Sequence, residues 1–230
     1  MRARVADLEL PREPLPRLVI FDLDGTITRR DTLSGYVFGY ALRQPWRLLG
    51  FILLIPAILR FCIDRDRGRL KGRLIAAVMG GSTKAAVASW TERYIPTLLA
   101  RGVFSEARQA IEQHRKAGDH LVLMSATVDL YIPELAAALG FNEWVCSRVR
   151  WNATGRLEGE LLGANVRGSE KAKHLKRLAA AHPGKRIVAY GNSDPDLPHL
   201  RLADQAILIN PSKALMRAAR DLPVLFKVWL

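Results

Sequence analysis

Short, mostly apolar runs alternate with helical patterns along most of the chain. Four runs of four or five residues are rich in strand-forming side chains, at residues 18–21, 121–124, 186–190 and 206–209. Continuous runs of this length are typical of strands that are buried on both faces, as in a parallel sheet. The runs therefore predict at least four neighbouring parallel strands.

Helical patterns lie between these runs, at residues 104–117, 128–139 and 170–181. Gly118 and Gly140 follow the first two patterns and are expected to end them, because glycine readily adopts the left-handed conformation that closes a helix. The alternation predicts an α/β fold with a doubly wound, Rossmann-like parallel sheet. Ligands of such sheets bind at the carboxyl ends of the strands.

Residues 33–99 interrupt the alternation. They contain no clear strand and much helical pattern, so we interpret them as a helical cap inserted after the first strand. The core is then expected to comprise residues 17–32 and 100–230, with a small hairpin near residues 151–159. Residues 1–16 lack the apolar stretch of a signal peptide and are interpreted as a flexible lead-in. The two cysteines, outside any motif, favour reduced thiols in a cytoplasmic setting.

Basic residues outnumber acidic ones. Lysine and arginine total 35, and aspartate and glutamate total 22, which gives a formal net charge of +13. Such a chain attracts polyanions: nucleic acid, anionic lipid or phosphorylated substrates. No RNA- or DNA-binding motif accompanies the charge, so nucleic acid is not an expected partner. Cys62 and Cys146 belong to no metal-binding or redox motif, and a disulfide framework is not expected.

Two carboxylates end the first predicted strand. Asp22 and Asp24 are two residues apart, so an extended chain directs both side chains to one side. Gly25 then allows a sharp turn. Carboxylates this close repel each other unless a metal ion and a proton separate their roles. The competing interpretation is an ordinary Asp-Gly turn.

Three further polar clusters follow predicted strands or open a predicted helix. Ser125 and Ala126 end the second strand, where a hydroxyl and free backbone N–H groups at a helix N-terminus would bind an anion. Lys171 lies in the first turn of a helix, where its positive charge opposes the helix dipole. Such a position is useful when the ammonium binds a phosphate. Residues 191–196 offer several side-chain oxygens for a hard cation. Each cluster alone also fits a helix cap or a solvated loop.

The order of these clusters resembles that of the haloacid dehalogenase superfamily. Residues 20–28 match its first motif, hhDxDGTxT, at every position, and the second, third and fourth motifs fall at Ser125, Lys171 and residues 191–196. The resemblance covers about residues 17–215. The helical insert resembles the cap of the phosphoserine phosphatase-like branch, and its arginine-flanked apolar stretch resembles that of phosphatidylglycerophosphatase C-type proteins.

The resemblance implies a magnesium-dependent phosphatase. Asp22 would attack phosphorus to form an aspartyl-phosphate, and Asp24 would act as general acid and then general base. Ser125, Ala126 and Lys171 would hold the phosphoryl oxygens. Mg²⁺ would be bound by Asp22, by Asp24 and by the fourth motif.

The fourth motif departs from the family pattern, since Asn192 stands where the family usually has aspartate. An amide oxygen can bind Mg²⁺ but brings no charge. Both Asn192 and Asp196 are therefore candidate metal ligands, and the sequence leaves open which one binds directly.

The predicted cap contains twelve uncharged residues, 48–59, between Arg47 and Arg60. The run is shorter than the roughly 20 residues of a membrane-spanning helix, and Pro56 weakens a straight helix. It is expected either to be a buried cap helix or to lie in a membrane interface. Residues 29–73 carry ten basic and three acidic residues, a net charge of +7 that favours an anionic bilayer surface.

Three cap positions are candidates for substrate contact. Asp31 occupies the place where the phosphoserine branch has an acidic residue facing the substrate amine, although it could also pair with Arg29 or Arg30. Lys71 and Arg73 are candidates to meet an anionic group, unless they belong to a solvated basic face.

The sequence thus predicts a phosphomonoesterase, with three functional hypotheses. The first is a phosphatase of a lipid or lipid-like phosphate, peripheral on the cytoplasmic face of a membrane. The second is a phosphatase of a small soluble metabolite such as phosphoserine. The third, a non-catalytic nucleic-acid or membrane binding module, is disfavoured because the acidic pair is intact.

Overall fold

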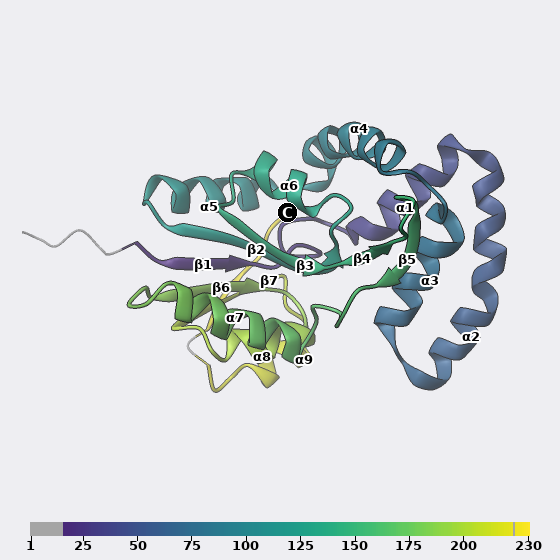
Figure 1. Cartoon of the computed structure of the whole chain (residues 1–230). Helices are drawn as coiled ribbons and strands as arrows, with labels where there is room; N and C mark the ends of the chain where they lie inside the picture. The colour runs from purple at the N-terminus through teal and green to yellow at the C-terminus, as the bar shows by residue number, and fades with distance from the viewer. Residues whose placement is uncertain (1–15, 223) are drawn as a thin grey trace, which may run out of the picture.

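A computed structural model describes residues 16–222 and 224–230 (Figure 1), so the N-terminal segment interpreted as a lead-in lies almost wholly outside the described residues. The centre is a six-stranded sheet of order β3-β2-β1-β6-β7-β8, and every neighbouring pair is parallel. Its strands are β1 (Leu18–Phe21), β2 (His120–Val128), β3 (Glu143–Ser147), β6 (Ile187–Gly191), β7 (Gln205–Ile209) and β8 (Val224–Lys227). The predicted α/β fold is confirmed.

Helices cover both faces of this sheet (Figure 1). One face carries α5 (Ser105–Lys116) and α6 (Ile132–Leu139), and the other carries α7 (Ser169–Ala181), α8 (Leu197–Leu200) and α9 (Lys213–Ala218). Successive β1 residues serve opposite faces, because strand side chains alternate. Val19 and Phe21 belong to one core cluster, and Leu18 and Ile20 belong to the other. All four are completely buried, as the continuous apolar run predicts.

The second strand is longer than its apolar run. β2 continues through Ser125 to Val128, and α6 begins only at Ile132, with Tyr131 as its N-cap residue. The helix expected from residue 128 therefore starts four residues later. A consequence for the site is that Ser125 lies in a strand and not at a helix N-terminus.

A helical segment connects β1 to α5. It consists of α1 (Thr32–Arg43), the 3-10 helix η1 (Pro45–Leu54), α2 (Ile55–Asp64), α3 (Arg67–Met79) and α4 (Lys84–Gly102). A two-stranded antiparallel hairpin, β4 (Val149–Trp151) and β5 (Leu157–Leu161), packs on α3. Gly159 in β5 has a positive φ of 88°, and a Cβ there would collide with the backbone of Ala76 in α3. Glycine thus permits the close approach that joins hairpin and helices.

The apolar stretch of this segment is exposed. No α2 residue is buried, and Leu49, Ile52 and Leu53 of η1 are 61% to 71% exposed. The expected buried cap helix is therefore wrong, although Leu54 is buried and Phe51 packs on the core. The helical run around residues 48–59 is longer than the uncharged stretch: Pro45–Asp64 has 20 residues and, by length and composition alone, could cross a membrane.

Candidate active site

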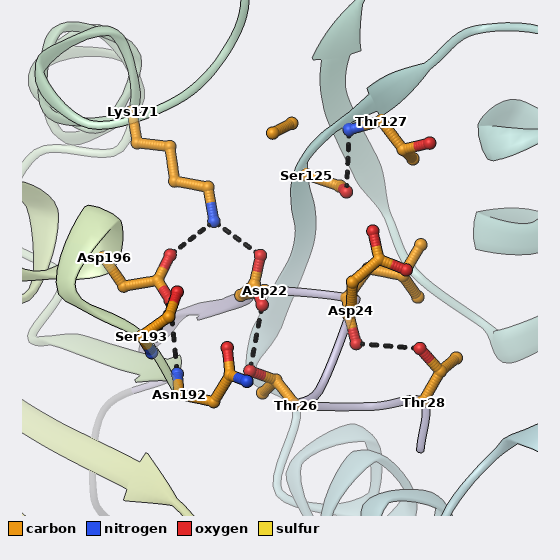
Figure 2. A network of polar contacts seen from close by, with 12 residues as sticks. Asp22, Asp24, Thr26, Thr28, Ser125, Thr127, Lys171, Asn192, Ser193 and Asp196 are labelled. Atoms are coloured by element: carbon orange, nitrogen blue, oxygen red, sulfur yellow. Dashed lines mark hydrogen bonds and ion pairs between the residues drawn. The ribbon is translucent and has the colours of Figure 1, made fainter. Parts of the chain in front are cut away.

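The predicted polar clusters meet at the carboxyl edge of the sheet (Figure 2). Asp22 directly follows β1, and Ser125 lies near the end of β2, the strand beside β1. Asn192 follows β6, the neighbour of β1 on its other side. Lys171 reaches the same point from the first turn of α7, and Asp196 from the loop after β6. Parallel strand order thus brings together side chains that are up to 174 residues apart in the sequence.

The ammonium of Lys171 joins two carboxylates. It donates to Oδ1 of Asp22 at 2.5 Å and to Oδ1 of Asp196 at 2.7 Å. The Thr26 hydroxyl donates to the other Asp22 oxygen at 3.0 Å. Each of the three charged side chains is less than 10% exposed, so this is a buried charge network. Such a network orients its members tightly, because burial makes unpaired charge costly.

Burial and charge shift the pKa values of this network in different directions. Burial raises the pKa of Asp22 to about 6, although Lys171 opposes the shift. Burial also acts on Asp196, but Lys171 outweighs it and lowers that pKa to about 2. Burial disfavours the charge on Lys171, yet the two carboxylates keep its pKa above the usual range. The surroundings therefore favour the charged form of Asp196 and disfavour the charged form of Asp22.

Asp24 has a separate environment. Its Oδ1 accepts hydrogen bonds from the backbone N–H and the hydroxyl of Thr32, both at 2.7 Å. Burial, followed by the charges of Asp31 and Asp22, raises the pKa of Asp24 to about 7. A carboxyl with a pKa near neutrality can both give and accept a proton. The two carboxylates of the first motif therefore differ in environment as the acidic-pair argument predicts.

The loop after β6 is organised by Asp196. Its Oδ2 accepts from the backbone N–H groups of Asn192 and Ser193, and from the Ser193 hydroxyl. Together with the Lys171 contact, both Asp196 oxygens are engaged by protein donors. Asn192 differs, since its Oδ1 is buried and has no hydrogen-bond partner among the described residues. Gly25, with a positive φ of 81°, lies so close to the Asn192 side chain that a Cβ there would collide with it.

The oxygen atoms at this point of the site fit a magnesium ion. A buried amide oxygen without a partner is costly, and hard oxygen ligands are those that Mg²⁺ prefers. In Figure 2 the side chains of Asn192 and Thr26 lie next to each other, below the Asp22 carboxylate. Asp24 borders the same pocket, and Asp196 holds the loop that carries Asn192. The residues present are thus compatible with the cation that the sequence led us to expect.

Ser125 and Ala126 occupy the strand β2 beside the carboxylates. Ser125 lines the pocket, and its Oγ accepts from the backbone N–H of Thr127 at 3.1 Å. The Ala126 carbonyl accepts hydrogen bonds from the ammonium of Lys71 and from the hydroxyl of Ser147. The expected helix N-terminus at this point is wrong, since the strand continues to Val128.

The carboxylates open into a pocket of about 360 Å³ between the sheet edge and helices α1 to α3. Asp31 and Lys71 line it, as expected. Asp31 also caps α1 by accepting from the Ser34 N–H, and it forms no ion pair among the described residues. Arg73 is exposed and lies outside this pocket, so its expected contact with substrate is not supported by the geometry.

Several pocket residues were not identified from the sequence. Arg167 and Arg67 add two guanidinium groups to the lining, and Phe61 adds an aromatic side chain from α2. Thr32 holds Asp24, and Thr26 holds Asp22. The sequence contains a signal that could have identified two of them. Thr26 is part of the matched first motif, and Arg167 directly precedes Gly168, the residue before the helix that carries Lys171. Arg67 and Phe61 belong to an irregular insert whose packing the pattern does not reveal.

The pattern of haloacid dehalogenase-like hydrolases matches residues 19–201, which include all of these clusters. The chain belongs to this family. It is 31% identical over 202 residues to Protein CicA of Caulobacter vibrioides, covering 86% of each chain. It is 30% identical to phosphoserine phosphatase SerB1 of Mycobacterium tuberculosis, covering 96% of this chain and 74% of that one. This hydrolase is therefore a phosphoric monoester hydrolase related to phosphoserine phosphatase.

The same fold occurs in a probable phosphoserine phosphatase from Vibrio cholerae. That structure matches with a TM-score of 0.67 and 16% identity, covering 88% of this chain and 58% of that one. At this identity the likeness shows the fold alone. No lipid phosphatase is among these relatives, so the expected likeness to phosphatidylglycerophosphatase C-type proteins is not shown.

Replacing Lys171 tests the importance of the charge network. Lys171→Met removes the cation between Asp22 and Asp196, so phosphatase turnover should fall about a thousandfold and the melting temperature should drop. Lys173→Met is the matched control, since Lys173 is 62% exposed and pairs only with Glu170 on the same helix. It should retain both activity and melting temperature. Equal effects of the two substitutions would contradict a special role for Lys171.

Proposed function

We propose that this hydrolase is a magnesium-dependent phosphomonoesterase that works through a phosphorylated Asp22. The observation that carries the proposal is the pair of buried carboxylates with different surroundings at one pocket. Asp22 is held by Lys171 and Thr26, and Asp24, with a pKa near 7, is held by Thr32. A nucleophile and a proton donor are the two groups that this covalent chemistry requires.

The reaction has two steps under this proposal. In the first, an Asp22 oxygen forms a bond to phosphorus while the ester P–O bond breaks, and Asp24 gives its proton to the leaving oxygen. In the second, Asp24 takes a proton from water as the water oxygen attacks phosphorus, and the Asp22–phosphorus bond breaks. Lys171 and the Ser125 hydroxyl are placed to hold phosphoryl oxygens, since both line the pocket beside Asp22.

Bound Mg²⁺ would neutralise charge on the phosphoryl group and on Asp22. Asn192 is the fourth-motif residue that we propose as a direct ligand, because its Oδ1 is buried without a partner. Asp196 is proposed not to bind the ion directly, since its oxygens already accept four hydrogen bonds from protein donors, against two at Asp22. Its contacts fix Lys171 and the backbone of Asn192.

The substrate that the pocket favours is a small phosphorylated amine such as phosphoserine. A volume of about 360 Å³ suits a small metabolite. Asp31 offers a carboxylate that could face an amine, and Lys71, Arg67 and Arg167 offer cations for a second anionic group. We infer that the helical segment acts as a cap, because α1, α2 and α3 all contribute side chains to this pocket. Under this proposal the enzyme is cytoplasmic.

The first test is a phosphatase panel with and without Mg²⁺. The wild type should hydrolyse phosphoserine and nitrophenyl phosphate only with the metal, and Asp22→Asn should lose both activities because an amide is a poor nucleophile toward phosphorus. Asp194→Asn, on the same edge but outside the pocket, is a control that should keep activity. Near wild-type turnover by Asp22→Asn would refute the covalent mechanism.

The second test concerns the metal ligand. Asn192→Asp adds a negative charge to the proposed cation site, so the Mg²⁺ concentration that gives half-maximal activity should fall. It is measured by titrating Mg²⁺ at fixed substrate. An unchanged Mg²⁺ requirement would place Asn192 outside direct contact and favour Asp196 as the ligand.

One observation favours a second candidate function, hydrolysis of a phosphate on a membrane amphiphile. Ten large apolar side chains between Phe38 and Ile63 are at least 47% exposed, and they cover α1, η1 and α2. In Figure 1, α2 stands on the outer side of the insert, away from the sheet. Phe61 of the same helix lines the active-site pocket. An apolar face beside a basic surface suits docking on an anionic bilayer, with the pocket near lipid head groups.

The exposed side chains define the variant that tests docking. Replacing Leu49, Ile52 and Leu53 with serine removes apolar surface without touching buried Leu54 or the packed Phe51. If docking is correct, the wild type should sediment with anionic liposomes, less so at high salt, and the triple variant should stay in the supernatant. Its activity on nitrophenyl phosphate should be unchanged. A wild type that never sediments with liposomes would leave the soluble metabolite as the substrate.

A further inference from the structure

A cluster of two histidines and a glutamate lies at the opposite edge of the sheet from the active site. His120 is the first residue of β2, Glu143 is the first residue of β3, and His182 directly follows α7. The Nε2 atoms of both histidines contact the same carboxylate oxygen, Glu143 Oε1, at 2.7 Å and 2.9 Å. The two imidazole rings lie 4.2 Å apart, centroid to centroid.

We propose that this cluster is a second metal site, selective for a borderline transition-metal ion such as Zn²⁺. Its three potential ligand atoms all lie within 4.8 Å of one another. Two imidazoles and one carboxylate form a ligand set that zinc takes in proteins, with water in the fourth position. The inference does not depend on the phosphatase proposal.

The geometry needs little change to accept the ion. Around a tetrahedral zinc, ligand atoms are about 3.4 Å apart, so the two contacts between Nε2 and Glu143 Oε1 must each lengthen by less than about 1 Å. Glu143 has more room to move than the histidines, because its side chain is 42% exposed and theirs are about 20% exposed. To bind a metal through Nε2, each imidazole must carry its proton on Nδ1, so that the Nε2 lone pair faces the ion.

The charges also favour a cation here. The two histidines lower the pKa of Glu143, although burial opposes the shift, so the carboxylate is ionised at neutral pH. Among the described residues, no lysine or arginine pairs with it, and the two imidazoles are its hydrogen-bond partners. The negative charge of this carboxylate is therefore one that a divalent ion would offset.

This site differs from the magnesium site in both ligand type and location. Imidazole nitrogen suits zinc, cobalt, nickel or copper, while the active site offers mainly oxygen ligands that suit Mg²⁺. α7 has 13 residues, so its C-terminal end lies about 20 Å from the first turn that carries Lys171. A bound ion would join the end of α7 to β2 and β3, and would thereby help to position the helix that delivers Lys171.

The test uses the full-length, untagged protein with Co²⁺ as a spectroscopic probe and Mg²⁺ in excess to occupy the active site. The wild type should bind one equivalent of Co²⁺ with the intense visible absorption of tetrahedral coordination, and Zn²⁺ should displace it. Zn²⁺ should also raise the melting temperature.

His182→Gln and His120→Gln should weaken binding by at least about 100-fold, since even residues that only orient a ligand cost 10-fold to 100-fold. His174→Gln on α7 is the matched control and should bind like the wild type, because His174 lies outside the cluster. If His120→Gln fails to fold, His182→Gln at the helix end carries the test. Absence of tetrahedral Co²⁺ absorption, or equal binding by His182→Gln and the wild type, would overturn the proposal and leave a hydrogen-bonded cluster only.

Discussion

The contact on which the site depends is the buried ammonium of Lys171 between Asp22 and Asp196. Three separate parts of the chain end there: β1 with Asp22, α7 with Lys171, and the loop after β6 with Asp196. Two carboxylates could not share this buried space without a cation, because burial penalises each charge and the charges repel each other. The ion network therefore fixes the spacing between β1, α7 and the loop after β6.

The acidic residues at this site differ in the groups that they contact. Asp196 organises the loop around it, since its two oxygens accept hydrogen bonds from Lys171 and from the backbone N–H groups of Asn192 and Ser193. Each Asp22 oxygen accepts one hydrogen bond, from Lys171 or from Thr26, and Asp22 lines the pocket. Asp24 lies outside the network and has its pKa raised by burial and by its acidic neighbours. The three carboxylates therefore differ in their partners, since Asp22 and Asp196 share Lys171 whereas Asp24 is held by Thr32.

Sequence patterns predicted the centre of the fold better than its edges. The four buried strands were visible because a strand covered on both faces must be apolar throughout, as residues 18–21 are. Edge strand β8 was missed because its apolar run, residues 224–226, ends at Lys227 after three residues and is mostly exposed, and β3 because polar Glu143 and exposed Trp144 begin it. Edge strands need not be continuous apolar runs, so periodicity does not mark them.

The candidate site was predictable where chemistry is carried by a local motif. Six candidate site residues were identified from their places relative to predicted strands and helices. The structure brings them to one edge of the sheet: Asp22, Asp24, Ser125, Lys171, Asn192 and Asp196. The sequence could not choose between Asn192 and Asp196, because the choice depends on hydrogen bonds that only the folded loop displays. It also could not exclude Arg73 from the pocket while placing Lys71 within it, since both lie on α3 and their side chains face different directions.

Under the proposed function, substrate choice depends on the side chains of the helical insert and not on those of the core. The carboxylates and Lys171 contact only the phosphoryl group under the proposed mechanism, so the remainder of the substrate meets Asp31, Phe61 and Lys71. α2 has two roles, because Phe61 faces the pocket while Leu59 and Ile63 are more than 60% exposed. A soluble metabolite would need only the inner side of this helix. An amphiphile would need both sides of the helix, with its polar end in the pocket and its apolar part near the exposed face. The two candidate substrates therefore differ in what the outer face of α2 contacts, whereas the phosphate chemistry in the pocket is the same for both.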